Sequence, residues 1–204
     1  MTITYPLSFP TNLGISSFML GLRESIGRNE SPYSFDEQIY DNMGQMWELE
    51  IGLPNMKRDD AEDFNAFLLK LRGRYGTFLV GDPNAATPRG TWAGTPVVDG
   101  GSQTGYNLNV KGFDAGATVK AGDYFSLGSG ANTHLHKIIT DGTADGSGDL
   151  TLEFMPMLRA SPADNDALTS SGAKGLFRLD SNISPFQINQ ESVYSIKFRA
   201  KESL

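Results

Sequence analysis

The sequence contains no cysteine, and this absence removes several kinds of chemistry at once. Without cysteine there is no disulfide framework, no thiolate zinc site and no cysteine nucleophile. The chain has only two histidines, His134 and His136, and they are too close together in sequence to suggest a catalytic triad. The redox chemistry of the chain therefore gives no indication of compartment.

Positive charge is also in short supply. The 204 residues include 17 Lys and Arg against 24 Asp and Glu, which gives a net charge of −7. Proteins that grip phosphate backbones do so with clustered Lys and Arg. The composition therefore argues against a nucleic-acid-binding protein, because an acidic surface would move past DNA without binding it.

Long apolar runs are missing as well. The first six residues lack the basic region and apolar core of a signal peptide, and no apolar run approaches the length of a membrane span. We therefore expect a soluble protein that is made in the cytoplasm, with no membrane insertion.

Glycine, in contrast, is abundant. Most of the 23 glycines lie between short apolar runs, which predicts many turns and a mainly β protein. The hydrophobic share of 39% and the charged share of 20% are ordinary for a globular chain of one large or two small domains.

The clearest pattern runs from Trp47 to Val80. Residues 47–53 alternate large apolar residues with polar or small ones, which is the period of a half-buried strand. The next segment has a helical period, with one apolar stripe formed by Ala61, Phe64, Phe67, Leu68 and Leu71. Gly73 is the expected left-handed stop, and residues 75–80 predict a second strand. The helix should pack on the sheet face that carries Trp47.

Three meandering strands are expected before the helix, and the strand that contains Trp47 is the last of them. Residues 17–23 predict one strand, which runs toward a polar hairpin tip at residues 27–32. Residues 34–41 predict a weaker strand, and residues 42–44 predict a turn into the strand that contains Trp47.

A second set of strands follows a Pro- and Gly-rich linker at residues 82–94. Five short strands without a helix fit a small barrel, at residues 97–98, 106–110, 124–127, 134–140 and 150–155. A polar connection then leads to C-terminal strands at residues 176–179, 185–188 and 194–199. These should return to the first sheet, which would otherwise be too thin. The prediction is a discontinuous domain of residues 1–90 and 161–204 with an inserted barrel of residues 91–160.

Few residues indicate chemistry. His134 and His136 share a strand face and are either a two-residue metal site or a half-exposed strand face. Residues 141–146 imitate half of a calcium loop, but Leu152 occupies the position of the bidentate carboxylate, so a hairpin turn is the favoured interpretation. Gly73 to Gly76 follows a helix instead of opening one, so it does not form a phosphate cradle. We assign no catalytic, cofactor-binding or metal-binding residue and expect that the protein is not an enzyme.

Several motifs occur along the chain in the same order as in a known family of proteins. They are the strand at residues 47–49, the turn at residues 53–56, the helix and its end at residues 61–78, and the segments 120–125 and 148–159. Together they resemble the distal tail proteins of long, non-contractile phage tails and related tail-tip proteins, over most of residues 16–200.

This resemblance implies a tail-tube-like β-sandwich with one flanking helix and an inserted small, OB-like β-barrel. It implies a structural virion protein that assembles in the host cytoplasm as a six-membered ring at the tail tip. The ring would connect the tail tube protein to the tail-tip hub protein, or baseplate, with DNA passing through its lumen without specific binding. No cofactor is implied.

A closed ring needs subunits that share edges or hairpins. The polar tip is therefore the candidate subunit interface, formed by Gly27, Arg28, Asn29, Glu30, Ser31, Pro32 and Tyr33. The candidate lumen-facing residues are Glu48 and Glu50 on the solvated face of the central strand, with Asp36 and Asp41 on its expected neighbour.

The alternative function is a carbohydrate- or peptide-binding module that acts in host adsorption, because small barrels bind such ligands. The barrel segment has the aromatic residues Tyr106, Phe113, Tyr124 and Phe125, but aromatic residues are equally core material.

Overall fold

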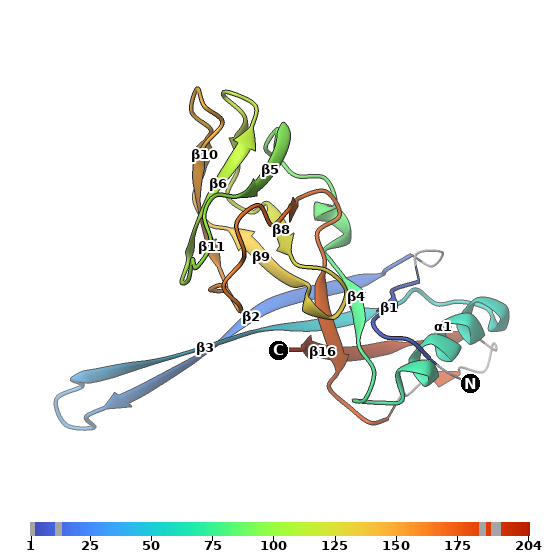
Figure 1. Ribbon diagram of the computed structural model, residues 1–204. Helices are drawn as coiled ribbons and strands as arrows, with labels where there is room; N and C mark the ends of the chain where they lie inside the picture. Colours follow the sequence, from blue (N-terminus) through green and yellow to red (C-terminus); the bar gives the residue numbers. More distant parts are fainter. Residues whose placement is uncertain (1–2, 11–13, 184–186, 189–192) are drawn as a thin grey trace.

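A computed structural model describes residues 3–10, 14–183, 187–188 and 193–204. The described chain is mainly β, with 44% of its residues in strands and one α-helix, which confirms the predicted class. Two six-stranded sheets form its two halves, and a long hairpin projects from the first of them (Figure 1). No helix in this part of the chain has the length and hydrophobicity needed to span a bilayer.

The first sheet, called the main sheet, contains both ends of the chain. Its strands in spatial order are β1 (Leu7–Ser8), β4 (Phe78–Val80), β13 (Gly175–Leu179), β16 (Lys197–Glu202), β3 (Glu37–Gly52) and β2 (Ser17–Glu30). The first pair is parallel and the others are antiparallel. The C-terminal strands β13 and β16 therefore return between β4 and β3, as predicted.

One predicted C-terminal strand and the start of another lie elsewhere, because the predicted strand at residues 194–199 is divided between β15 (Tyr194–Ser195) and β16. Gln187–Ile188 forms β14, which pairs with β15 in a separate two-stranded sheet. Residues 185 and 186 of that prediction lie outside the described residues.

The helix α1 (Arg58–Leu71) covers one face of the main sheet. All five residues of its predicted apolar stripe are buried, and they pack against a sheet face that includes Trp47, Leu49 and Ile51. This arrangement confirms the predicted strand, helix and strand. The left-handed turn begins one residue earlier than expected, because Arg72 already has φ of 55° and Gly73 continues it at 64°.

The prediction of three meandering strands is wrong: β2 and β3 are two long strands of one hairpin. Residues 27–30 are still strand, and the tip is formed by residues 31–36. Residues 42–44 form a bulge within β3 instead of a turn, since pairing shifts between Glu24 and Ile26 of β2. The Asp41 carboxylate accepts a hydrogen bond from the Met43 N–H at 2.7 Å, so the polar residues that suggested a turn kink the strand without ending it.

The second sheet, called the barrel sheet, confirms all five predicted strands. Its spatial order is β12 (Leu168–Thr169), β8 (Tyr124–Leu127), β9 (His134–Ile138), β11 (Leu150–Met155), β6 (Asn107–Phe113) and β5 (Gly94–Val98). A β-bridge between Val97 and Ala167 brings its two ends together, so the sheet is nearly closed. Its interior is a separate hydrophobic core that includes Trp92, Phe125 and Phe154. The remaining elements are η1 (Pro83–Ala85), η2 (Gly130–Asn132) and the pair β7 (Thr118–Val119) and β10 (Gly142–Thr143).

The chain enters and leaves the barrel half at adjacent points. The Gly172 N–H donates a hydrogen bond to the Ala86 carbonyl at 2.7 Å, so residues 87–171 begin and end side by side. Within that range β12 pairs with β8, which places residues 168–169 in the barrel sheet. The predicted division at residues 90 and 161 stays a prediction.

Trp47 joins the two halves. Its indole N–H donates to the Leu135 carbonyl at 2.9 Å, and its ring packs against Tyr124, with 6.4 Å between the ring centroids. Its backbone N–H donates to Glu202 at 3.0 Å, and Glu202 also forms a buried ion pair with Arg159 at 2.6 Å. The contact between the halves is therefore specific as well as apolar.

Deleting residues 87–171 and bridging the gap with a short Gly-Ser linker should leave a folded main domain. The two ends are already adjacent, but the loss of Tyr124 and Leu135 from the surroundings of Trp47 should lower the melting temperature below that of the full chain. Circular dichroism during heating measures both properties. A deletion of residues 92–157 is the matched comparison and should melt less cooperatively, because it leaves Leu158 and Leu168 without the barrel core. If neither the 87–171 deletion nor the isolated segment melts cooperatively, the chain is not divided in this way.

Candidate assembly interface

The far half of the hairpin, residues 26–43, is called the arm. Its two strands pair only with each other, from Ile26 opposite Asp41 to Glu30 opposite Glu37, whereas β16 pairs with β3 only between Glu48 and Gly52. Among the described residues, both edges of the arm therefore lack a neighbouring strand. The arm projects well beyond the main sheet (Figure 1). Unpaired edges of this kind are templates for pairing with another chain.

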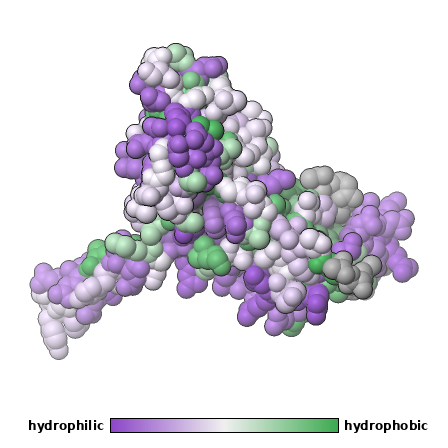
Figure 2. Space-filling model, viewed as in Figure 1, coloured by the Kyte–Doolittle hydropathy of each residue, from purple (hydrophilic) through white to green (hydrophobic). Residues whose placement is uncertain are grey.

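Large apolar side chains are exposed along the arm. Six are more than half exposed: Ile26, Tyr33, Phe35, Ile39, Tyr40 and Met43. Hydrophobic residues lie among the polar ones on the projecting arm in Figure 2. Exposed apolar surface that is rimmed by polar residues marks an interaction site in soluble proteins. The arm is the strongest candidate for such a site in the described structure.

The tip of the arm has a defined shape. The Ser31 N–H donates to the Asp36 carbonyl at 2.9 Å, and the Phe35 N–H donates to the Ser31 carbonyl at 3.0 Å. Phe35 has φ of 60°, an uncommon conformation for a bulky residue, and its side chain is 72% exposed. Behind the tip, Arg28 forms one ion pair with Glu30 on its own strand and one with Glu37 across the hairpin.

The predicted interface residues all lie in this arm. Gly27, Arg28, Asn29 and Glu30 are on β2, and Ser31, Pro32 and Tyr33 begin the tip. Sequence reasoning missed the exposed residues on the returning strand, because their pattern also suits an ordinary strand. One signal was present: Ile39 and Tyr40 are adjacent, so they point to opposite faces of the strand and do not share the single face that a half-buried strand requires.

Glu48 and Glu50 lie on the main-sheet face opposite α1, and a row of basic side chains on β16 lies beside them. Glu50 pairs with Lys197 and Arg199 at 2.5 Å each, and Glu48 pairs with Arg23 at 3.2 Å and Lys201 at 3.9 Å. Hydrogen bonds from Lys197 and then Arg199 lower the pKa of Glu50. The Glu50 side chain is only 15% exposed, so the expectation that both glutamates are freely solvated is wrong for Glu50.

The structure does not bring the four predicted lumen residues together. Asp36 and Asp41 were expected on a strand beside Glu48, but Asp36 is in the tip and Asp41 is on β3 itself. Asp41 and Glu48 are seven positions apart on β3, which would span about 23 Å in a fully extended strand and less across the bulge at residues 42–44. The prediction failed because it placed a turn at residues 42–44, where the strand continues.

The two histidines of β9 differ in burial: His136 is buried within the barrel half, whereas His134 is half-buried. The His136 ring lies between Phe125 and Phe154, with centroid distances of 5.2 and 4.9 Å, and Nδ1 is 2.8 Å from the Pro156 carbonyl. A carbonyl only accepts hydrogen bonds, so Nδ1 carries the proton. Burial lowers the pKa of His136 to about 3, which keeps the ring neutral. No group of three or more His, Asp or Glu side chains suited to a metal occurs in the described residues.

The calcium-loop pattern lies in the connection between β9 and β11, but it is only partly the favoured hairpin turn, because Gly142–Thr143 form β10 and the turn follows at residues 146–147. The Asp141 carboxylate binds Lys120 Nζ and the Ala121 N–H at 2.8 Å each. The Asp145 carboxylate accepts hydrogen bonds from the backbone N–H groups of Ser147 and Asp149. Both side chains therefore already hold the local backbone.

The aromatic residues proposed for ligand binding lie mainly in the core. Phe113, Tyr124 and Phe125 are buried, and only Tyr106 is exposed. They therefore do not form an exposed aromatic platform for a glycan ring.

No protein-family model matches the chain, and no curated protein matches it.

Proposed function

We propose that this chain is a structural virion protein that forms a six-membered ring at the distal end of a phage tail. The ring connects the tail tube protein to the tail-tip hub, and DNA passes through its lumen. In this proposal the main sheet with α1 corresponds to the tail-tube-like β-sandwich domain, and the nearly closed barrel sheet corresponds to the OB-like insertion.

The arm is the observation that carries the proposal. Within the described part of the chain it has two unpaired strand edges, and it has six exposed apolar side chains, which a monomer would leave in water. A projecting arm contacts a different surface on the next copy, so the contact is heterologous and closes into a ring when the rotation between copies is right. An assembly role accounts for all of these features, whereas no cluster of described residues suggests catalysis.

The mass of the protein in solution tests this proposal. Light scattering on a size-exclusion column should give a species about six times the 22.1 kDa subunit mass. The variant Ile39→Asp/Tyr40→Ser should be monomeric with an unchanged melting temperature, because both side chains are exposed and contribute little to the monomer core. Ser147→Asp, on an exposed turn of the barrel half, is the control and should still assemble. A wild-type protein that stays monomeric at every concentration contradicts the ring.

The charged face of the main sheet suits a DNA channel because its acidic side chains neutralise its basic ones. A row of Lys and Arg facing the lumen would hold phosphate by salt-sensitive contacts. Here Glu48 and Glu50 balance the basic row of β16 through the ion pairs described above. Under this proposal the glutamates prevent the face from gripping DNA as it passes.

The variant Glu48→Gln/Glu50→Gln should make assembled rings retain duplex DNA at low salt. Glutamine keeps the size of glutamate and one acceptor oxygen, but it carries no charge and so leaves the Lys and Arg charges unbalanced. Filter binding should detect retention that disappears as salt screens the contacts, whereas wild-type rings should retain no DNA. Glu62→Gln is the control, because Glu62 pairs with Arg58 on the outer side of α1. Equal retention by wild-type and variant rings would show that this face does not line the channel.

A further inference from the structure

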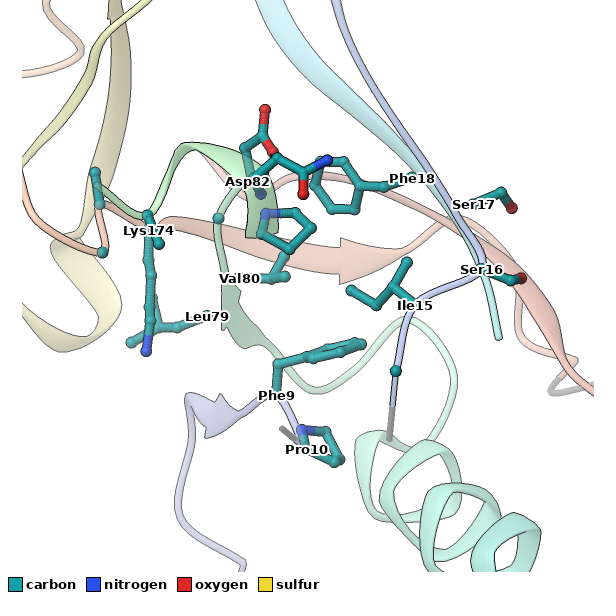
Figure 3. A pocket seen from close by; sticks show the side chains of 17 residues that line it. Phe9, Pro10, Ile15, Ser16, Ser17, Phe18, Leu79, Val80, Asp82 and Lys174 are labelled. Atoms are coloured by element: carbon teal, nitrogen blue, oxygen red, sulfur yellow. Dashed lines mark hydrogen bonds between the residues drawn. The ribbon is translucent and has the colours of Figure 1, made fainter. Parts of the chain in front are cut away.

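A groove opens at the end of the main sheet from which β2 begins. It has a volume of about 540 Å³, and Phe9, Ile15, Phe18 and Val80 point into it from three different segments (Figure 3). The Phe9 ring also packs against Phe64 of α1, with 5.6 Å between the centroids, so this wall is anchored in the core. Pockets of about 300–1,000 Å³ hold drug-sized ligands, so the groove has room for large side chains.

We infer that this groove receives the tip of the arm of the next copy, with Tyr33 and Phe35 as the inserted side chains. The inference rests on the proposed ring and names the surface to which each arm docks. Tyr33 is 94% exposed and Phe35 is 72% exposed, and they flank Ser34 at the end of the arm. Aromatic side chains of this kind dominate the energetics of protein interfaces.

The positions of the tip and the groove favour a second copy over the same chain. Phe18 is near the start of β2, and the tip follows Glu30 at its end. The 14 residues of this strand extend for about 46 Å, so one chain cannot fold its tip into its own groove. The two complementary surfaces lie at opposite ends of one hairpin, which is the arrangement that a head-to-tail ring needs.

Charge also fits this pairing. Lys174 lies at the rim of the groove, and Asp36 lies in the tip next to Phe35. Neither side chain has an ion-pair partner within the described residues; Asp36 accepts one hydrogen bond, from Ser34 Oγ at 2.7 Å. In contrast, the Asp82 carboxylate at the groove already accepts a hydrogen bond from the Asn84 N–H at 2.9 Å. In the docked arrangement, the Lys174 ammonium of one copy would pair with the Asp36 carboxylate of the next.

Disulfide trapping tests the docking, and the absence of native cysteine makes the result easy to interpret. Ser34→Cys in the tip and Asn84→Cys at the groove are combined in one chain; both positions are exposed. Because disulfides need Cβ atoms about 3.5–4.5 Å apart, oxidation should link successive copies only if the tip sits at the groove. A non-reducing gel should show a ladder that ends at the covalent hexamer. Ser34→Cys with Ser147→Cys is the matched control and should give no ladder.

A charge exchange provides a second measurement that does not depend on oxidation. Asp36→Lys alone and Lys174→Asp alone should each weaken assembly at least tenfold, and the double variant should recover most of the loss. Rings that form normally without a disulfide-linked ladder and without charge rescue would overturn the docking site and leave the ring intact. Monomers under all conditions, measured before oxidation, would overturn the ring and the docking together.

Discussion

Replacing Trp47 with alanine is expected to lower the free energy of unfolding by about 3–5 kcal/mol, as for other buried aromatic residues. Trp47 is only 4% exposed and contacts both halves of the molecule. The variant would lose the ring packing against Tyr124 and leave the Leu135 carbonyl without its indole donor. Chemical denaturation, monitored by a probe in each half, measures the loss.

Glu48 is the matched control for Trp47, because it is the next residue on the same strand and points to the opposite face. Its ion pairs with Arg23 and Lys201 are surface pairs, so Glu48→Ala should cost less than about 1 kcal/mol. Equal losses at residues 47 and 48 would mean that the faces of β3 are assigned incorrectly.

Asp123→Ala is expected to cost about 3 kcal/mol or more, although aspartate is rarely important to a core. Its buried carboxylate accepts four hydrogen bonds, from the backbone N–H groups of Arg89, Gly90 and Lys120 and from the indole N–H of Trp92. Burial acts to raise the pKa of Asp123, but these hydrogen bonds outweigh it and lower the pKa. Removing the carboxylate leaves the buried Trp92 indole N–H and three part-buried backbone N–H groups without this acceptor, and a buried unsatisfied donor costs about 1–3 kcal/mol unless water enters.

Thermal denaturation, with Trp92 fluorescence as a local probe, measures this loss. Asp149→Ala is the control, because Asp149 is an exposed aspartate of the same half and should change stability little. The stability of Asp123→Asn should fall between those of the two alanine variants, since its amide retains one acceptor oxygen but presents an NH₂ group to the remaining donors. An Asp123→Ala variant as stable as Asp149→Ala would show that the hydrogen bonds do not hold the segment at residues 89–92 in place.

Local patterns predicted much of this fold. The stripe from Ala61 to Leu71, the alternation through Trp47 and the barrel strands all depend on the period of side chains within one element, which the sequence displays directly. The two-residue strand β12 could not be found in this way, because two residues have no period. The bulge at residues 42–44 was misassigned because the same polar residues suit a turn.

The candidate site was less predictable, because it depends on residues that are distant in sequence. Glu50 is almost 150 residues from Lys197 and Arg199, and only the pairing of β16 with β3 brings them together. The groove combines Phe9 and Phe18 with Val80, again through the topology of the sheet. The tip was found from its polar composition, whereas its exposed aromatic residues became evident only when the structure placed them outside any core.

The arm also has a consequence for the kinetics of assembly. A two-stranded hairpin with no third strand and no core is marginally stable in water. The amide protons of the arm in the free subunit should therefore exchange with solvent much faster than those of β3 near Trp47, through opening events that leave the rest of the fold intact. Docking would suppress that exchange, so part of the interaction free energy would go into ordering the arm. In the proposed ring, subunits would then remain separate at low concentration and assemble only when several meet.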